Sequence, residues 1–171
     1  ELLASSLNRI GVSPTIVAWS GRMGGDWLDG FEYEQRKESP TESTAQDTSN
    51  LVHDLLEAEV DIILYAGGDG TTRDIVNALD GNETPLIGVP GGVKMHSGCF
   101  ATTPKASAEV LLAFLQGDLM VAITEVMDLD EETYQKGEWK VRMYGEAWTP
   151  SSPRFMQGAK EQVERASESD T

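Results

Sequence analysis

Residues 65–72 read Tyr65-Ala66-Gly67-Gly68-Asp69-Gly70-Thr71-Thr72, and they lie between an apolar run and a stretch with helical spacing. Glycines let the backbone approach a ligand closely, and the free N–H groups at a helix start favour an anion such as phosphate. Asp69 is the unexpected member, because a carboxylate repels phosphate unless it holds a metal ion or receives a proton. The loop matches neither the Walker pattern nor the GxGxxG fingerprint. A plain strand-to-helix turn with Asp69 as a helix cap is the alternative.

Short apolar runs predict strands on both sides of this loop. The runs at 15–19, 61–65 and 85–89 have the composition of buried strands, and residues 31–35 predict a further short strand. The second run contains Ile62-Ile63-Leu64, which is continuous enough to be buried on both faces of a sheet.

Helical spacing recurs between these strands. Apolar residues at helical intervals predict helices over 44–59, 71–79 and 103–116. Thr103-Pro104 supplies an N-cap and a proline at the first helical position of the last of these helices. Strands that alternate with helices predict an α/β fold with a doubly wound, mostly parallel sheet.

A second glycine loop, Pro90-Gly91-Gly92, follows the strand at 85–89. Ligands of doubly wound sheets bind at the carboxyl ends of the strands. Both glycine loops follow strands, so we expect them to line one crevice.

The pattern changes after Gly117. Residues 121–129 and 139–144 predict two strands, which together suggest a hairpin or the start of a β-rich region. We therefore divide the chain into an α/β nucleotide-binding domain at 1–120, followed by the start of a β-rich second domain and a polar C-terminal segment at 121–171.

The charge of the chain argues against nucleic acid as a partner. It carries 29 acidic and 13 basic residues, a formal net charge of -16, and such a surface repels phosphate backbones. The plainest explanation of the acidity is a well-solvated surface.

The single cysteine, Cys99, cannot form a disulfide within the chain, which suits a reducing compartment. No apolar run approaches the length of a membrane span, and residues 1–4 lack the basic start of a signal peptide. We expect a cytoplasmic protein with no membrane association. The helical spacing of residues 2–10 predicts that the printed sequence opens inside a helix.

Several stretches carry a resemblance to a known group of kinases. Gly67-Gly68-Asp69-Gly70-Thr71 resembles the signature of the NAD kinase and diacylglycerol kinase superfamily, and the similarity continues through residues 75–79. Residues 85–92 resemble the second substrate loop of that group. Val93-Lys94-Met95-His96-Ser97-Gly98-Cys99-Phe100-Ala101 is similar to the ATP-NAD kinase-like branch that includes acetoin-catabolism AcoX proteins, as are residues 125–130 and 156–160.

The resemblance implies an α/β domain followed by a β-sandwich domain, with the active site between them. It also implies ATP or another phosphoryl donor, Mg²⁺ as cofactor and NAD as acceptor. The family pattern includes two parts that we do not find in the printed sequence. One is a strand with its own glycine loop, expected before residue 1, and the other is most of the β-sandwich, expected after residue 171. Arg73-Asp74 stands where lipid kinases of the group carry Asn-Glu, which disfavours a lipid substrate.

The requirements of phosphoryl transfer, which are positioning and charge neutralisation, suggest the candidate site residues. Asp69 is expected to be catalytic, by accepting or orienting the proton of the ribose 2′-hydroxyl. Lys94 offers a point charge to phosphate. The residues expected to bind the nucleotide are Gly67, Gly68, Gly70, Thr71, Thr72, Gly91, Gly92, Lys94, His96 and Ser97.

Other polar residues have simpler explanations beside the functional ones. His96 and Lys94 are also explained as solvated loop residues, and Cys99 as a small packed side chain without a nearby base. Asp128 and Asp130 are metal-ligand candidates, although acidic residues are common at strand ends. Asp47 and Thr48 lie near the start of the helix predicted at 44–59. They either reach the crevice or cap the helix. His53 is expected to be exposed.

Three functions remain in competition on the sequence. The first is an NAD kinase-like enzyme that makes NADP. The second is a lipid or other small-alcohol kinase with the same loop, and the third is a non-catalytic nucleotide-binding regulatory module. The metal ligands and the oligomeric state, with a homo-oligomer as one option, are left open.

Overall fold

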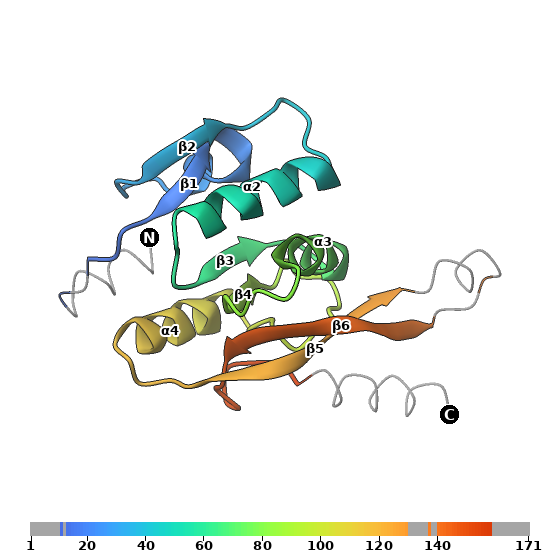
Figure 1. Cartoon of the computed structure of the whole chain (residues 1–171). Helices are drawn as coiled ribbons and strands as arrows, with labels where there is room; N and C mark the ends of the chain where they lie inside the picture. Colours follow the sequence, from blue (N-terminus) through green and yellow to red (C-terminus); the bar gives the residue numbers. More distant parts are fainter. Residues whose placement is uncertain (1–10, 12, 130–136, 138–139, 159–171) are drawn as a thin grey trace.

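The computed structural model of the chain describes residue 11, residues 13–129, residue 137 and residues 140–158. Strands and helices alternate through the first two thirds of this part, and two long strands follow (Figure 1). The strands are β1 (Val17–Ser20), β2 (Glu34–Glu38), β3 (Ile63–Ala66), β4 (Leu86–Val89), β5 (Val121–Leu129) and β6 (Val141–Pro150). The helices are the short 3₁₀ turns η1 (Gly21–Met23) and η2 (Gly25–Trp27), and α2 (Ala45–Glu57), α3 (Asp69–Leu79) and α4 (Pro104–Leu115).

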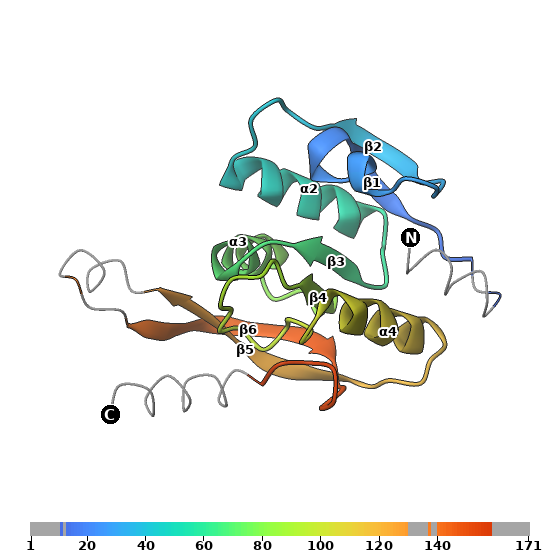
Figure 2. The same ribbon diagram turned by 180° about the vertical axis from the view of Figure 1, so that it is seen from behind.

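The α/β class predicted from the sequence is confirmed. Strands β1 and β2 pair in parallel, β3 and β4 pair in parallel, and β5 and β6 form an antiparallel hairpin. Within the described residues these are three separate two-stranded sheets. Helix α2 lies between the β1–β2 pair and the β3–β4 pair in both views (Figures 1 and 2).

The β3–β4 pair carries helices on both of its faces. On one face, Ile63 and Leu86 pack with Val52 of α2 and Ile75 of α3 in a buried apolar cluster. On the other face, Ile87 packs with residues of α4 in a second cluster. Burial of each of these large apolar side chains contributes about 1.5–3 kcal/mol.

The first cluster also holds the hairpin against the α/β part. Val126 of β5 is fully buried in it and Ala147 of β6 is nearly so. Thr149 of β6 donates a hydrogen bond of 2.8 Å to the carbonyl oxygen of Leu86 in β4. The hairpin therefore shares one core with the β3–β4 pair.

The β1–β2 pair is joined to α2 through Trp19. Its side chain is fully buried, and its indole N–H donates to the Asp54 carboxylate of α2 at 2.7 Å. The ammonium group of Lys37 lies 5.1 Å from the centre of the Trp19 ring, a cation–π contact.

Most element predictions are confirmed and a few need correction. Residues 121–129 form β5 as predicted, and Thr103 caps α4 through a bond from the Ala106 N–H. The strand predicted at 31–35 begins at Glu34, because its register is set by pairing with β1, while its side chains are all exposed. The second hairpin strand, predicted at 139–144, continues to Pro150; its predicted first residue lies outside the described part.

The expectation that β3 is buried on both faces is wrong. Ile63 is 4% exposed, whereas its neighbour Leu64 is 43% exposed. The reason is that α4 covers β4 on that face, where Ile87 is fully buried, and leaves β3 beside it partly open. The predicted opening helix at 2–10 lies outside the described residues.

Gly88 in β4 provides a test of this packing. A Cβ atom there would lie 2.5 Å and 2.6 Å from atoms of the Phe100 ring, which is fully buried. We expect Gly88→Ala to lower the free energy of unfolding by about 1–3 kcal/mol, because the ring has no room to retreat. Gly91→Ala is the control, since its Cβ would meet nothing within 4 Å. Equal urea midpoints for the two variants would contradict the packing described.

Candidate active site

The loop between β3 and α3 starts the helix earlier than the sequence predicted. The helix begins at Asp69 instead of Thr71, and Gly68 is its N-cap in an extended conformation. No side chain caps the helix start, so the hypothesis that Asp69 serves as a helix cap is wrong. The side chain of Asp69 leaves its own helix and points to the second glycine loop.

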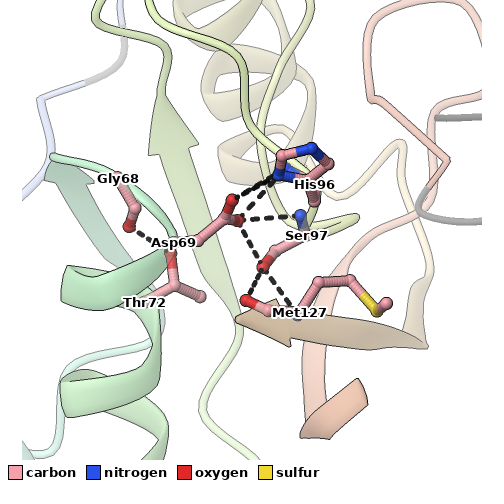
Figure 3. A network of polar contacts seen from close by, with 6 residues as sticks. All are labelled: Gly68, Asp69, Thr72, His96, Ser97 and Met127. Carbon is pink, nitrogen blue, oxygen red and sulfur yellow. Dashed lines mark hydrogen bonds and ion pairs between the residues drawn. The ribbon is translucent and has the colours of Figure 1, made fainter. Parts of the chain in front are cut away.

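The Asp69 carboxylate accepts four donors from two consecutive residues of that loop (Figure 3). Its Oδ2 lies 2.9 Å from the backbone nitrogen of His96 and 3.1 Å from Nδ1 of the same residue. Its Oδ1 lies 2.9 Å from the backbone nitrogen of Ser97 and 2.7 Å from the Ser97 hydroxyl. One carboxylate thus joins the loop after β3 to the loop after β4.

Ser97 extends this network to the hairpin. Its side chain is fully buried, and its hydroxyl oxygen accepts a 2.9 Å bond from the Met127 N–H of β5 (Figure 3). The next amide in the loop, that of Gly98, donates to the carbonyl oxygen of Glu125. The loop is therefore fixed between α3 on one side and β5 on the other.

Thr72 lies in the core instead of on the loop surface. It is fully buried, and its hydroxyl donates to the carbonyl oxygen of Gly68 at 3.0 Å and contacts the Tyr65 hydroxyl at 2.6 Å. Tyr65 also lies 3.2 Å from the sulfur of Cys99. The Thr72 hydroxyl is thus engaged within the protein, where it holds the Gly68 carbonyl in place.

The thiol of Cys99 and the phenol of Tyr65 have raised pKa values because they are buried. Burial raises the pKa of the Cys99 thiol to about 11, and it raises the pKa of Tyr65 well above its ordinary value. Cys99 is fully buried and stays a neutral thiol at neutral pH, which agrees with the prediction of a packed, unreactive side chain.

The glycines of the two loops fall into two groups. A Cβ on Gly67 would lie 2.7 Å from the Thr71 hydroxyl oxygen and 2.8 Å from its Cβ, so Thr71 occupies that space. A Cβ on Gly70, Gly91 or Gly92 would meet nothing within 4 Å. Gly67 is therefore required by packing, whereas the other three leave open space beside the loops.

Residues 91–94 form the exposed part of the second loop. Lys94 lies in this stretch with its side chain in solvent, and Gly92 adopts a positive φ of 84°. Below this stretch the loop turns inward at Met95, which is 3% exposed. The loop therefore presents one cation at its tip and the Asp69 partners at its base.

An ion pair joins α3 to the hairpin beside the site. Nη1 of Arg73 lies 2.6 Å from Oδ2 of Asp128, and this bond raises the pKa of the Arg73 guanidinium. Asp128 is therefore engaged by a cation, which weakens its candidacy as a metal ligand. Asp130 lies outside the described part. Among the described residues no cluster of three His, Cys, Asp or Glu side chains is arranged to hold a metal ion.

Two further predictions on α2 can be checked. Thr44 and Asp47 form a capping box, in which Asp47 Oδ2 accepts from the Thr44 N–H at 2.8 Å. Capping, and not the crevice, is thus the role of Asp47. His53 is exposed, as predicted.

Sequence reasoning found the loops but missed the bonds between them. The ion pair of Arg73 with Asp128 and the contact of His96 with Asp69 join residues 55 and 27 positions apart. The contact of His96 with Asp69 could have been anticipated, because an unpaired carboxylate in a glycine loop needs donors. No sequence signal marked the ion pair of Arg73 with Asp128.

The fold and the loops define a class of protein: an α/β protein in which two glycine loops at parallel strand ends share one carboxylate. The chain belongs to the ATP-NAD kinase family, because the model of the ATP-NAD kinase N-terminal domain matches residues 8–119. This membership indicates a kinase that uses ATP. No protein of curated function and no solved structure matches the chain significantly.

In the part of the chain described, no helix is both long and apolar enough to cross a bilayer.

The bond between Ser97 and Met127 gives a stability prediction. Ser97→Ala removes one donor from the Asp69 carboxylate and leaves the Met127 N–H without its acceptor. We expect the free energy of unfolding to fall by about 1–3 kcal/mol, because a buried polar group then lacks a partner. Ser151→Ala, at an exposed position, serves as the control. Identical urea denaturation curves for both variants would show that the hydroxyl is not engaged as described.

The buried thiol and phenol predict a loss of stability at high pH. The folded-state pKa of Cys99 is about 11 against an ordinary 9.0, so folding favours the neutral thiol. Its contribution is complete below about pH 9 and is lost as the pH rises to about 11; Tyr65 acts in the same direction. We expect the free energy of unfolding to fall by roughly 1–3 kcal/mol over that interval.

Urea denaturation at the two ends of this pH interval measures the change. Cys99→Ala removes the thiol and should show a smaller decrease than the unmodified chain. An equal decrease in both proteins would exclude Cys99 as its source.

Proposed function

We propose that this chain is an NAD kinase-like phosphotransferase that moves the terminal phosphoryl group of ATP to the ribose 2′-hydroxyl of NAD, giving NADP. We also propose that it belongs to the AcoX-like branch of the family, on the similarity of residues 93–101. The observation that carries the proposal is the carboxylate of Asp69, held by the loop after β4 at the carboxyl end of the β3–β4 pair.

The arrangement of the two loops suits a nucleotide. Phosphoryl transfer depends mainly on positioning and on neutralising the charge of the phosphates. The N–H groups at the uncapped start of α3 offer donors to phosphate. The open space beside Gly70, Gly91 and Gly92 would let backbone lie against the ligand, and the exposed Lys94 would supply a positive charge.

Buried residues support these loops in the proposal. Thr72 and Ser97 act from within, since Thr72 fixes the Gly68 carbonyl and Ser97 fixes Asp69. Asp69 has two ways to contribute to catalysis. It either accepts the hydroxyl proton after releasing one of its donors, or it orients the imidazole of His96 beside it.

Mg²⁺ is implied by the family, and the described residues do not form a site for it. Asp69 is occupied by four donors and Asp128 by Arg73, and no cluster of three ligands is present among the described residues. Mg²⁺ commonly reaches kinases on the phosphates of the nucleotide. The proposal therefore assigns no protein ligand to it.

The proposal is tested by incubating the full-length protein with NAD and ATP and measuring NADP. We expect NADP formation, and a decrease in kcat of about 10²–10⁴-fold for Asp69→Asn, because the amide cannot take the place of the carboxylate. Asp80→Asn is the matched control at the exposed C-cap of the same helix. An Asp69→Asn protein that is folded and fully active would contradict the assignment.

The acceptor is tested by the same assay with a panel of alcohols. Phosphorylation of a lipid or another small alcohol, but not of NAD, would replace the proposed acceptor. Thermal shift completes the test, since a ligand at 100 times its Kd adds about 2.7 kcal/mol of stability. Stabilisation by ATP without any phosphorylated product would indicate a regulatory module.

A further inference from the structure

His96 and Asp69 form a histidine–carboxylate pair at the base of the second loop. Nδ1 of the imidazole lies 3.1 Å from Oδ2 of Asp69, and both side chains are largely shielded from solvent. An ionised carboxylate only accepts hydrogen bonds, so Nδ1 carries the proton of this bond. In the neutral imidazole the other nitrogen, Nε2, is then an acceptor with a free lone pair.

The Asp69 carboxylate has no acceptor capacity left for a substrate. A carboxylate offers about four lone-pair positions, and four donors occupy them: two backbone N–H groups, the Ser97 hydroxyl and the imidazole. For Asp69 to take a proton from an incoming hydroxyl, one of these donors would have to leave. Two of them are main-chain groups in a loop that is itself bonded to β5.

Unlike the Asp69 carboxylate, Nε2 of His96 is free to accept a hydrogen bond. No hydrogen bond to it is formed within the described part of the chain. Figure 3 shows this nitrogen on the side of the ring turned away from Asp69. The backbone N–H of His96 donates to the same carboxylate as its ring does, so the ring is held at two points and its free nitrogen has a fixed position.

We infer that His96, and not Asp69, is the proton acceptor of the phosphoryl transfer, with Asp69 as the positioning residue that fixes its tautomer. The inference rests on the proposed function. The hydroxyl proton passes to Nε2 as the acceptor oxygen forms its bond to the terminal phosphorus of ATP. The bond from that phosphorus to the bridging oxygen breaks, ADP leaves with the electron pair, and the imidazolium beside Asp69 later releases its proton to water.

The sharpest variant is His96→Asn. The asparagine amide offers an N–H close to the position of Nδ1, so the donor to Asp69 is kept while the base is removed. We expect kcat for the phosphorylated product to fall by about 10²–10⁴-fold, with the Kd values for ATP and NAD changed by less than about threefold. His53→Asn is the matched control, because His53 is the other histidine of the chain and is exposed.

Chemical rescue by imidazole distinguishes a catalytic base at position 96 from a residue with a structural role. In His96→Ala, added imidazole should restore at least about a tenth of the lost kcat, because a free base can enter the space left by the ring. A wild-type protein that is active while His96→Asn keeps most of its kcat overturns the inference and leaves the proposed function standing. A wild-type protein that phosphorylates no acceptor overturns the proposed function, and the inference with it.

A readout that does not require activity comes from ¹⁵N NMR of the imidazole ring. Since Asp69 accepts from Nδ1, we expect the Nδ1–H tautomer of His96 in the full-length protein and a loss of that preference in Asp69→Ala. A spectrum with the proton on Nε2 would overturn the inference whatever the assay shows.

Discussion

The site depends on the bonds between one carboxylate and one turn. Asp69 begins α3, yet its side chain is bonded entirely to His96 and Ser97 of the loop after β4. Hydrogen bonds to an ionised group are stronger than neutral ones, and four of them converge here. Without the carboxylate, two main-chain N–H groups and a buried hydroxyl would lose this acceptor, and the loop would be held only by its bonds to β5. The same bonds that shape the site also leave the imidazole with one free nitrogen.

The rest of the fold places this carboxylate at the carboxyl ends of strands β3 and β4. The parallel β3–β4 pair brings both loops to the same end of the sheet, while the apolar clusters on its two faces fix the helices that follow the strands. Tyr65, Thr72 and Cys99 form a buried polar group under the first loop. Membership of the ATP-NAD kinase family agrees with a site in which positioning matters more than any reactive side chain.

Local sequence was enough to predict the elements and the two loops. Thr103-Pro104 fixed the start of α4, and glycines after apolar runs marked the strand ends, because these signals act over a few residues. Contacts between residues far apart in the sequence could not be predicted from local patterns. The exposure of Leu64 depends on how far α4 extends over the sheet, and the engagement of Thr72 and Ser97 depends on Tyr65 and Met127, which no local pattern connects to them. Thr72 and Ser97, which the sequence predicted to bind the nucleotide, are both fully buried.

The attachment of the second loop to β5 has a consequence for cooperativity. Ser97 and Gly98 are bonded to Met127 and Glu125, and Arg73 is paired with Asp128 of the same strand. A fluctuation that detaches the hairpin would therefore release the loop and the helix start together. Partial opening of the molecule would disrupt the candidate site before the helices themselves melt, so resistance to heat inactivation would be governed by the hairpin and not by the α/β layers.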